Sequence, residues 1–470
     1  MRAGTFEMAD VAIIGAGPAG YVAAIRATQL GAAVVLIEKD EVGGVCLNRG
    51  CIPTKALLES ANLLSKIAKA RRYGISVGDV SVDISSIMER KNTIVKRIVS
   101  STRRLVESYD IEIVKGTATI TGSREVTVTN SSSVKKIGAN NIVIATGSEP
   151  AFLRVPGLER TRTLTSDDVL AVEDLPRNLL IIGGGVIGVE FACIFKRLGA
   201  SVTIVEIMPQ LLLGEDEEMA SFLQHLLEEE GVNVLTNAQV AKIEEKSDGT
   251  TVVVATRNGE KTLTTEAILV AVGRVPKTDG LGLGDIRVDE RGRIIVDKRM
   301  KTSVSNIYAV GDVVGRYMLA HVASAEAIVA AENILGTTVE MDYRAVPRCV
   351  YTSPEVASVG LTEKQAIASG HKTTVGRFSF LSSSRALTLS EDRGGIKVVA
   401  DANSGEILGI HMIGPEVSEM IHEAVLAMKL EATVHDVADM IYAHPTLSEA
   451  LKEAALDAVG RSIHKVRSKS

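Results

Sequence analysis

Two cysteines, Cys46 and Cys51, stand five positions apart in residues 43–55, which read GGVCLNRGCIPTK. Five residues of regular α-helix rise about 7.5 Å along the helix axis, whereas the Cα atoms of a disulfide lie within about 7 Å of each other. A regular helix therefore cannot hold this pair as a disulfide. Gly50 frees the backbone before Cys51, and Pro53 cannot donate a helical backbone hydrogen bond, so we expect a distorted helix here.

The same stretch suggests how one of the two sulfurs is activated. Pro53 suits the first turn of a helix that continues through Lys55, which places Cys51 near a helix N-terminus, where the dipole favours a thiolate. A reducible pair with one activated sulfur is what dithiol–disulfide exchange requires. The pair could also be two unreactive buried thiols or half of a metal site. The other cysteines, Cys193 and Cys349, stand alone and far apart, so we predict no metal site.

A histidine and a glutamate near the end of the chain, His444 and Glu449, can supply the base that such chemistry needs. Only a thiolate attacks a disulfide, and an ordinary dithiol is protonated at neutral pH, so a base that works near neutrality is required. There is a structural alternative. Thr446 and Glu449 also fit a capping box, in which Glu449 only closes the start of the last helix and His444 is an ordinary loop residue. Local sequence alone favours this alternative.

The elements that must position these groups include a nucleotide-binding unit. A short apolar strand at residues 11–14 leads into a G-x-G-x-x-G loop at residues 15–20, and a second strand ends at Glu38. Such glycines permit a tight turn and let a pyrophosphate approach the helix N-terminus, while the acid accepts hydrogen bonds from a ribose diol. The predicted dinucleotide contacts are Gly15, Gly17, Gly20 and Glu38.

The same unit occurs a second time, 168 residues later (183 against 15, 206 against 38). The strand at residues 179–182 leads into the loop at residues 183–188, and the next strand ends at Glu206. One such loop is weak evidence, because glycines mark many strand–helix turns. Two loops with strand, helix and acid in register predict two dinucleotide sites, the second at Gly183, Gly185, Gly188 and Glu206.

Three more apolar segments are predicted strands. Residues 142–147 and 268–273 would each close the sheet of one unit, and residues 307–312 carry Asp312 at their tip. Any one of these segments alone would be only a core strand that meets a turn. Together with the repeated loops they predict two α/β sheets.

The remaining segments are less regular. Residues 60–109 predict a long amphipathic helix, broken near residues 74–80, and residues 111–129 alternate in the manner of antiparallel strands. After residue 341 short alternating strands mix with helices, which predicts a separate α+β domain with helices at residues 417–430 and 447–459.

Composition excludes several classes of function. The 470-residue chain has a formal net charge of -6 and no basic block, so nucleic acid and anionic membrane are not expected partners. No apolar run reaches the roughly 18 residues of a membrane span, and residues 1–7 lack the apolar core of a signal peptide. Four cysteines do not make a secreted disulfide framework. The expected location is therefore cytoplasmic.

Taken together, these pieces resemble the pyridine nucleotide–disulfide oxidoreductase family, and within it the enzymes that oxidise dihydrolipoamide to lipoamide with NAD. The resemblance covers nearly the whole chain. It implies an α/β fold of two Rossmann-like units, which bind FAD and NAD, plus a C-terminal α+β dimerisation domain. The motifs that carry it are residues 43–55, both glycine loops, and residues 309–312, 318–321, 351–356 and 444–449.

The resemblance also implies a role for each part of the chain. The expected domains are an FAD-binding domain with the redox disulfide at residues 1–150, an NAD-binding domain at 151–279, a central domain that completes the FAD site at 280–345, and the dimerisation domain at 346–470. A homodimer is implied. The implied partners are a small-molecule or protein-bound lipoyl dithiol and the acyltransferase core of a 2-oxoacid dehydrogenase or related complex.

Residue roles follow from the same resemblance. Cys46 is implied to meet the substrate and Cys51 to face the flavin, while His444, oriented by Glu449, reaches the other subunit's disulfide. Lys55 is the implied flavin-side cation, paired with Glu190. The other implied FAD contacts are Gly116, Thr146, Gly147, Ser148, Asp312, Met318, Leu319, Ala320 and His321, and the other implied NAD contacts are Val240 and Gly273.

The choice of NAD over NADP rests on three residues. Glu206 would repel a ribose 2′-phosphate, and neither Ile207 nor Met208 is an arginine that could receive it. The chain departs from the family pattern at Tyr442, Val322 and Lys277, and also at Arg49.

Arg49 lies between the two cysteines, where it could alter their potential or admit an acidic substrate. Two alternative functions stay open. One is a related reductase that acts on another disulfide or on a metal ion, and the other is a non-catalytic FAD-binding subunit of a dehydrogenase complex.

Overall fold

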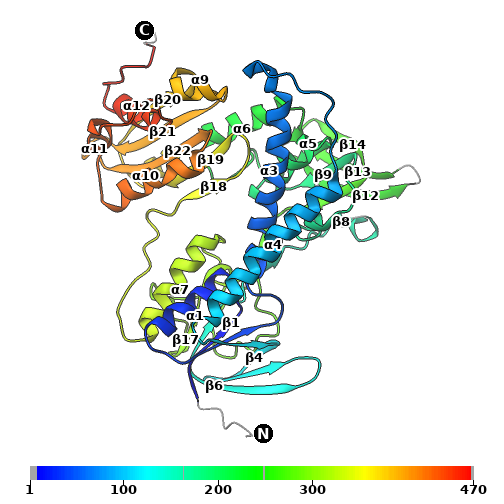
Figure 1. The fold of residues 1–470 in the computed structure, drawn as a ribbon, viewed down its shortest axis with the longest axis vertical. Coiled ribbons are helices and arrows are strands. Elements are labelled where there is room, and N and C mark those ends of the chain that lie inside the picture. Colours follow the sequence, from blue (N-terminus) through cyan, green and yellow to red (C-terminus); the bar gives the residue numbers. More distant parts are fainter. Residues whose placement is uncertain (1–7, 162, 247–248, 467–470) are drawn as a thin grey trace.

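The fold is that of a computed structural model, which describes residues 8–161, 163–246 and 249–466. Residues 1–7, which entered the prediction of location, lie outside these ranges. Figure 1 shows three bodies: the first nucleotide unit at the bottom, the second at the upper right and the C-terminal domain at the upper left. Long helices of the first unit pass upward between them. None of the helices in the described ranges has the length and apolarity needed to cross a membrane.

The first unit is built on a mostly parallel sheet. Its strand order is β3-β2-β1-β6-β5-β4, and β17 pairs with β6. The C-terminal half of β6 is parallel to β1, while its N-terminal half forms an antiparallel meander with β5 and β4. The strands are β1 (Ala9–Ile14), β2 (Val34–Glu38), β3 (Glu112–Lys115), β4 (Thr117–Gly122), β5 (Glu125–Thr129), β6 (Val134–Ile144) and β17 (Ile307–Ala309).

One prediction for this region is wrong in part. Residues 111–129 were expected to be antiparallel throughout, but β3 is parallel to β2, with Val35 opposite Glu112. The reason is that β3 follows the long helical crossover from β2, and such a crossover returns the chain in the same direction. The antiparallel prediction is confirmed for β4 and β5.

Helices cover this sheet and lead away from it. α1 (Pro18–Gln29) packs against α7 (Ala320–Ile334) on one face. The cysteine segment forms α2 (Gly44–Arg49) and α3 (Cys51–Ala68), and η1 (Ala70–Tyr73) and α4 (Ile84–Glu107) follow. The expected break in the long helix is confirmed, because no helix or strand lies between Tyr73 and Ile84.

The second unit repeats the first. Its sheet is parallel, in the order β11-β10-β9-β15-β8, and an antiparallel sheet β12-β13-β14 follows. A two-stranded ribbon of β7 (Ser148–Pro150) and β16 (Arg274–Pro276) joins the two units. The elements are η2 (Leu158–Arg160), β8 (Thr163–Leu164), η3 (Asp168–Ala171), β9 (Asn178–Ile182), α5 (Val186–Arg197), β10 (Ser201–Val205), α6 (Glu217–Glu229), β11 (Asn233–Leu235), β12 (Gln239–Lys246), β13 (Gly249–Thr256), β14 (Gly259–Thr265) and β15 (Ala267–Val270).

The C-terminal domain is an antiparallel sheet covered by helices, with strand order β18-β19-β22-β21-β20. The two helices expected here are confirmed as α10 and α12, although α12 starts two residues later than predicted. The elements are β18 (Arg348–Val350), β19 (Glu355–Gly360), α8 (Glu363–Ala368), β20 (Thr373–Ser379), η5 (Phe380–Ser382), α9 (Ser384–Leu389), β21 (Gly395–Asp401), β22 (Ile407–Gly414), α10 (Val417–Lys429), α11 (Val434–Asp439) and α12 (Glu449–Ala458). The short η4 (Gly311–Val313) lies outside this domain, directly after β17 of the first unit's sheet.

Candidate active site

A cavity of about 1840 Å³ lies where the two nucleotide units and the C-terminal domain meet. It exceeds the roughly 300–1,000 Å³ of an ordinary small-molecule pocket, so it has room for more than one nucleotide. Most of the residues expected from the sequence line it: Gly15, Gly17, Glu38, Cys46, Cys51, Lys55, Thr146, Gly147, Ser148, Gly183, Gly185, Glu190, Glu206, Val240, Gly273, Asp312, Met318, Leu319, Ala320 and His321.

Five expected residues are not among those that line this cavity. Gly20 and Gly188 lie behind the loops, and Gly116 donates its amide hydrogen bond to the carbonyl of Glu38, 3.0 Å away. His444 and Glu449 lie on the C-terminal domain, outside the cavity of their own chain.

Both glycine loops need glycine for steric reasons. Gly15 and Gly183 have φ of +103° and +111°, in the region that L side chains rarely adopt. A Cβ on Gly20 would lie 1.7 Å from the Gly15 carbonyl oxygen, and one on Gly188 would lie 2.0 Å from that of Gly183. The loops therefore keep a bare backbone at two helix N-termini, which is the cradle that a pyrophosphate requires.

The two strand-end acids occupy equivalent places. The Glu38 carboxylate accepts a hydrogen bond from the Ala16 amide at 2.6 Å, and the Glu206 carboxylate accepts one from the Gly184 amide, also at 2.6 Å. Burial raises the pKa of Glu38, although the Ala16 amide opposes that shift. Each acid thus lies at the edge of its glycine loop, where it can meet a ribose.

The helix break at the cysteine pair is confirmed. Gly50, with φ −145° and ψ −114°, separates α2 from α3, and Cys51 is the first residue of α3. Both cysteines are reduced thiols, and they hydrogen-bond to each other. This bond lowers the pKa of Cys51, and Lys55 adds to the effect against the opposing influence of burial. The bond and burial raise the pKa of Cys46.

A half-buried ion pair stands beside Cys51. Lys55 Nζ lies 2.8 Å from Glu190 Oε2, and Glu190 is 4% exposed. Glu190 also accepts a hydrogen bond from the Tyr351 amide at 2.9 Å, and the Lys55 ammonium lies 4.5 Å from the centre of the Tyr351 ring. Tyr351 therefore fixes both partners, a role that sequence reasoning missed.

Arg49, the unusual residue between the cysteines, turns toward two acids. It forms an ion pair with Asp40 and a longer one, of 3.8 Å, with Asp167, which lies between β8 and η3 of the second unit. Its charge is thereby shared between two carboxylates.

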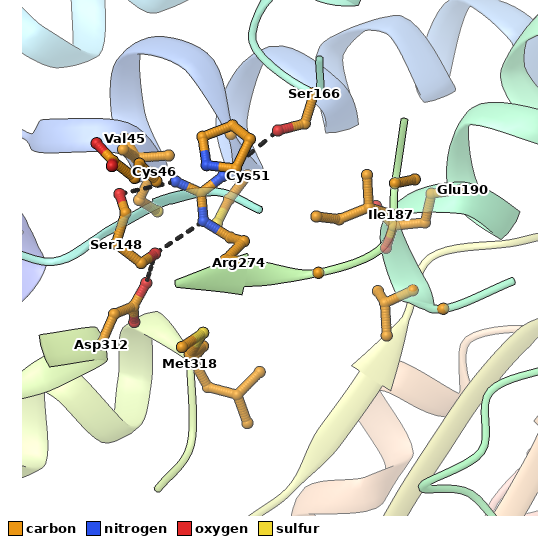
Figure 2. Close-up of a pocket in the computed structure, with 18 of the residues that line it drawn as sticks. Val45, Cys46, Cys51, Ser148, Ser166, Ile187, Glu190, Arg274, Asp312 and Met318 are labelled. Carbon is orange, nitrogen blue, oxygen red and sulfur yellow. Dashed lines mark hydrogen bonds between the residues drawn. The ribbon is translucent and has the colours of Figure 1, made fainter. Parts of the chain in front are cut away.

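Figure 2 shows a chain of hydrogen bonds that runs from Ser166 through Arg274 and Ser148 to Asp312. Arg274 donates from Nε to Ser148 Oγ at 2.8 Å, and Ser148 Oγ donates to Asp312 Oδ2 at 2.6 Å. Arg274 also donates to Ser166 Oγ at 3.3 Å. Burial raises the pKa of Asp312. The chain fixes the direction in which Asp312 faces the cavity.

Glu326 supports Asp312 through the backbone of the neighbouring Gly311. Sequence reasoning missed this residue. Its carboxylate accepts hydrogen bonds from the Gly311 amide and from the Tyr343 hydroxyl, both at 2.7 Å. Glu326 is 1% exposed and lies among the alanines on the apolar face of α7. Burial raises the pKa of its carboxyl group. A single acid on an otherwise apolar helical face was the available signal.

The histidine and glutamate near the chain end form a pair. His444 Nδ1 lies 2.9 Å from Glu449 Oε1, and the imidazole side chain is 70% exposed. The Thr446 amide donates to Glu449 Oε2 at 2.8 Å, but the Thr446 hydroxyl donates to the Ala443 carbonyl instead of capping the helix. Only half of the expected capping box therefore forms. Burial raises the pKa of Glu449, but Thr446 and His444 outweigh it and the net shift is downward.

Within the described ranges, no three histidine, cysteine, aspartate or glutamate side chains are arranged to hold an ion.

Known proteins share this organisation. The family described as pyridine nucleotide-disulphide oxidoreductase matches residues 9–327, and its dimerisation domain matches residues 346–455. Dihydrolipoyl dehydrogenase from Bacillus subtilis (strain 168) is 42% identical over 459 residues, which cover 97% of this chain and 99% of the relative.

Solved structures are similar along the whole chain. LpdA from Mycobacterium tuberculosis has a TM-score of 0.88 at 27% identity and covers 95% of this chain and 98% of its own. The HOCl-induced flavoprotein disulfide reductase RclA from Escherichia coli, solved as a Cu(II) complex, has a TM-score of 0.86 at 30% identity, with 96% and 99% covered. With both family patterns matched and the predicted fold class confirmed, the chain belongs to the pyridine nucleotide–disulphide oxidoreductase family.

Proposed function

We propose that the chain oxidises a dihydrolipoyl dithiol to the lipoyl disulfide with NAD as the acceptor, which is the activity of a dihydrolipoyl dehydrogenase. The observation that carries the proposal is the cysteine pair at the start of α3, beside the Lys55–Glu190 ion pair and between two dinucleotide cradles. Relatives named dihydrolipoyl dehydrogenase, 42% identical over nearly the whole chain, support it.

FAD is assigned to the first cradle and NAD to the second. The first has the glycine loop, Glu38 and the partly buried acid Asp312, which suits a ribityl hydroxyl chain. The second has Glu206 at its edge, and its backbone-bonded carboxylate would repel a 2′-phosphate. A bound FAD would supply the redox group that accepts two electrons from the reduced Cys46–Cys51 pair and passes them to NAD as hydride.

The protein's own residues carry out the exchange steps. His444, held by Glu449, takes a proton from one substrate thiol, and the thiolate attacks the sulfur of Cys46 in the oxidised pair. The Cys46–Cys51 bond breaks, and Cys51 leaves as a thiolate that Lys55 stabilises. His444 releases the first proton to solvent and takes the proton of the second substrate thiol, which attacks the substrate sulfur of the mixed disulfide. The lipoyl disulfide forms, and the departing Cys46 sulfur receives this proton from His444 and is released as a thiol.

We assign His444 to the cavity of a second subunit. It does not line the cavity of its own chain, it is largely exposed, and it lies in the region that matches the dimerisation domain of the family. A homodimer would bring it to the partner's disulfide. The segments 1–150, 151–279, 280–345 and 346–470 are the proposed FAD, NAD, central and dimerisation domains. The acyltransferase core of a 2-oxoacid dehydrogenase or related complex is the proposed physiological partner.

The direct test is the initial rate of nicotinamide reduction with dihydrolipoamide. We expect NADH to form, and NADP to be used at least about tenfold less efficiently, since a charged 2′-phosphate would face Glu206. Glutathione disulfide with NADPH serves as the control for a related reductase. Faster turnover with that pair, or no flavin reduction by dihydrolipoamide, would refute the proposal.

Replacing Glu326 with alanine is expected to weaken FAD binding. A buried hydrogen bond to a charged group contributes about 1.5–3 kcal/mol, and its full loss corresponds to about a 10- to 100-fold higher Kd. Glu326→Gln should recover much of the affinity, because its amide oxygen still accepts from Gly311. FAD release on dilution, followed by flavin fluorescence, measures the effect.

The matched control for this prediction is Glu332→Ala on the same helix. Glu332 pairs with Arg26 on α1, away from Gly311. If Glu332→Ala released FAD as readily as Glu326→Ala, the support of Asp312 by Glu326 would be disproved.

A further inference from the structure

Five polar residues form a row across the C-terminal sheet. In the strand register Arg348 is opposite Ser358, Ser358 opposite His411, His411 opposite Lys397, and Lys397 opposite Arg377. Directly opposite side chains share one face of a sheet, so all five project from the same side. We call them the polar row. Its three central members are buried: Ser358 and His411 are 0% exposed, and Lys397 is 3% exposed.

The polar row meets acids at the start of α6 in the second nucleotide unit. Lys397 Nζ lies 3.0 Å from Asp216 Oδ2 and 2.6 Å from Glu218 Oε1. Arg377 also pairs with Glu218, at 2.6 Å, and α6 contacts β22. Figure 1 shows α6 between this sheet and the rest of its unit.

A third acid in the same segment, Glu215, is also held by the polar row. Glu215 accepts a hydrogen bond from Arg348 Nε at 2.9 Å and another from the Ser358 hydroxyl. Its side chain is 7% exposed. Burying an ion pair costs desolvation free energy, so buried ion pairs are in general weak evidence for added stability. Several of them along the polar row suggest instead a role in fixing the position of the segment that carries these acids.

The segment held by the polar row begins at Glu206 and connects the second dinucleotide cradle to α6. Glu206, at its start, accepts hydrogen bonds from the amides of Gly184 and Met208. The Leu212 amide donates to the Gly184 carbonyl at 2.9 Å, and Leu211 packs so closely that a Cβ on Gly184 would lie 2.4 Å from its Cδ2. The Glu215 amide then donates to the Leu212 carbonyl at 2.7 Å.

These ion pairs, hydrogen bonds and packing contacts form one continuous series. It runs from the polar row through Glu215 and Asp216, back along the 207–215 segment, to Gly184 in the glycine loop and to Glu206. We propose that Lys397, through Asp216, is a positioning residue for the NAD site: it holds the cradle and its ribose acid against the dimerisation domain. This rests on the proposed function only in naming NAD as the ligand of the second cradle.

The test compares two steps in the FAD-loaded enzyme. Lys397→Met removes the charge and keeps the length of the side chain. We expect the Kd of the oxidised holoenzyme for NAD, measured by titration calorimetry, to rise about tenfold, within the about 5- to 150-fold range typical of coupling between sites. Reduction of the flavin by dihydrolipoamide without NAD, followed in a stopped-flow instrument, should keep its rate.

The control is Lys364→Met, which removes an exposed lysine from α8 of the same domain and should change neither measurement. An unchanged Kd in folded, FAD-loaded Lys397→Met would overturn the proposal. A parallel loss in both steps would also overturn it, because that pattern indicates general destabilisation. If dihydrolipoamide does not reduce even the parent enzyme, the proposed function fails while the NAD titration still decides this inference.

A milder variant covers the case in which Lys397→Met does not fold. Asp216 caps α6 by accepting from the Glu218 amide at 3.1 Å, and asparagine can do the same. Asp216→Asn therefore keeps the helix cap and removes only the charge that faces Lys397. We expect a smaller rise in the Kd for NAD, and a value equal to the parent's would refute the positioning role.

Discussion

Replacing Cys51 with serine is expected to lower NADH formation from dihydrolipoamide by about 10³-fold or more, because no disulfide can form and no thiolate remains beside Lys55. FAD should stay bound, since Cys51 is one of many residues that line the cavity. Steady-state rates on the FAD-loaded variant, with flavin content measured for each sample, give the result.

The chain offers a matched control for this substitution. Cys349 lines the same cavity, and burial raises the pKa of its thiol to about 12, so it is not a nucleophile near neutral pH. Cys349→Ser should therefore keep most of the activity. If Cys51→Ser turned over at a rate near that of the parent, the cysteine pair would be one of the unreactive alternatives and the proposed function would fall.

Replacing His444 with glutamine should slow oxidation of the dithiol by about 10²- to 10⁴-fold, which is the usual contribution of a general base. The flavin and the disulfide stay in place, so reduction of the enzyme by NADH should be nearly unaffected. The control is His371→Gln, which breaks another histidine–carboxylate pair of the C-terminal domain, with Asp401 at 3.2 Å. Equal losses in both variants would argue against a role for His444 as a base.

A mixed dimer distinguishes action on the partner's disulfide from action within one chain. One subunit carries Cys51→Ser and the other carries His444→Gln. If His444 serves the partner's disulfide, one of the two sites keeps both groups, and we expect about half of the parent activity. If His444 acts within its own chain, neither site is complete, and the mixed dimer should be inactive.

The cavity shows which features can be anticipated from local sequence. Gly15 is needed because of its positive φ and Gly20 because a side chain there would strike the Gly15 carbonyl, so the spacing of the glycines, repeated 168 residues later, identified the loops. The break at Gly50 and the start of α3 at Cys51 follow from glycine and proline chemistry in the same way. These requirements on backbone conformation act over a few residues, so they can be recognised in the local sequence.

Long-range packing decided the rest. Glu190 meets Lys55 across 135 positions, Glu326 supports Gly311 from another helix, and β3 joins β2 in parallel rather than antiparallel pairing. Long-range packing also decides that His444 lies outside the cavity of its own chain.

By itself, the sequence determined the chemistry: a cysteine pair at a helix break, two glycine cradles with their acids, and a histidine with a nearby carboxylate. Each depends on backbone conformation within one turn or loop. Tertiary structure alone decided how these parts face one another, including the polar row that places Lys397 against Asp216. Such contacts join residues far apart in the chain, and they form only when whole sheets and helices pack, so no local pattern encodes them.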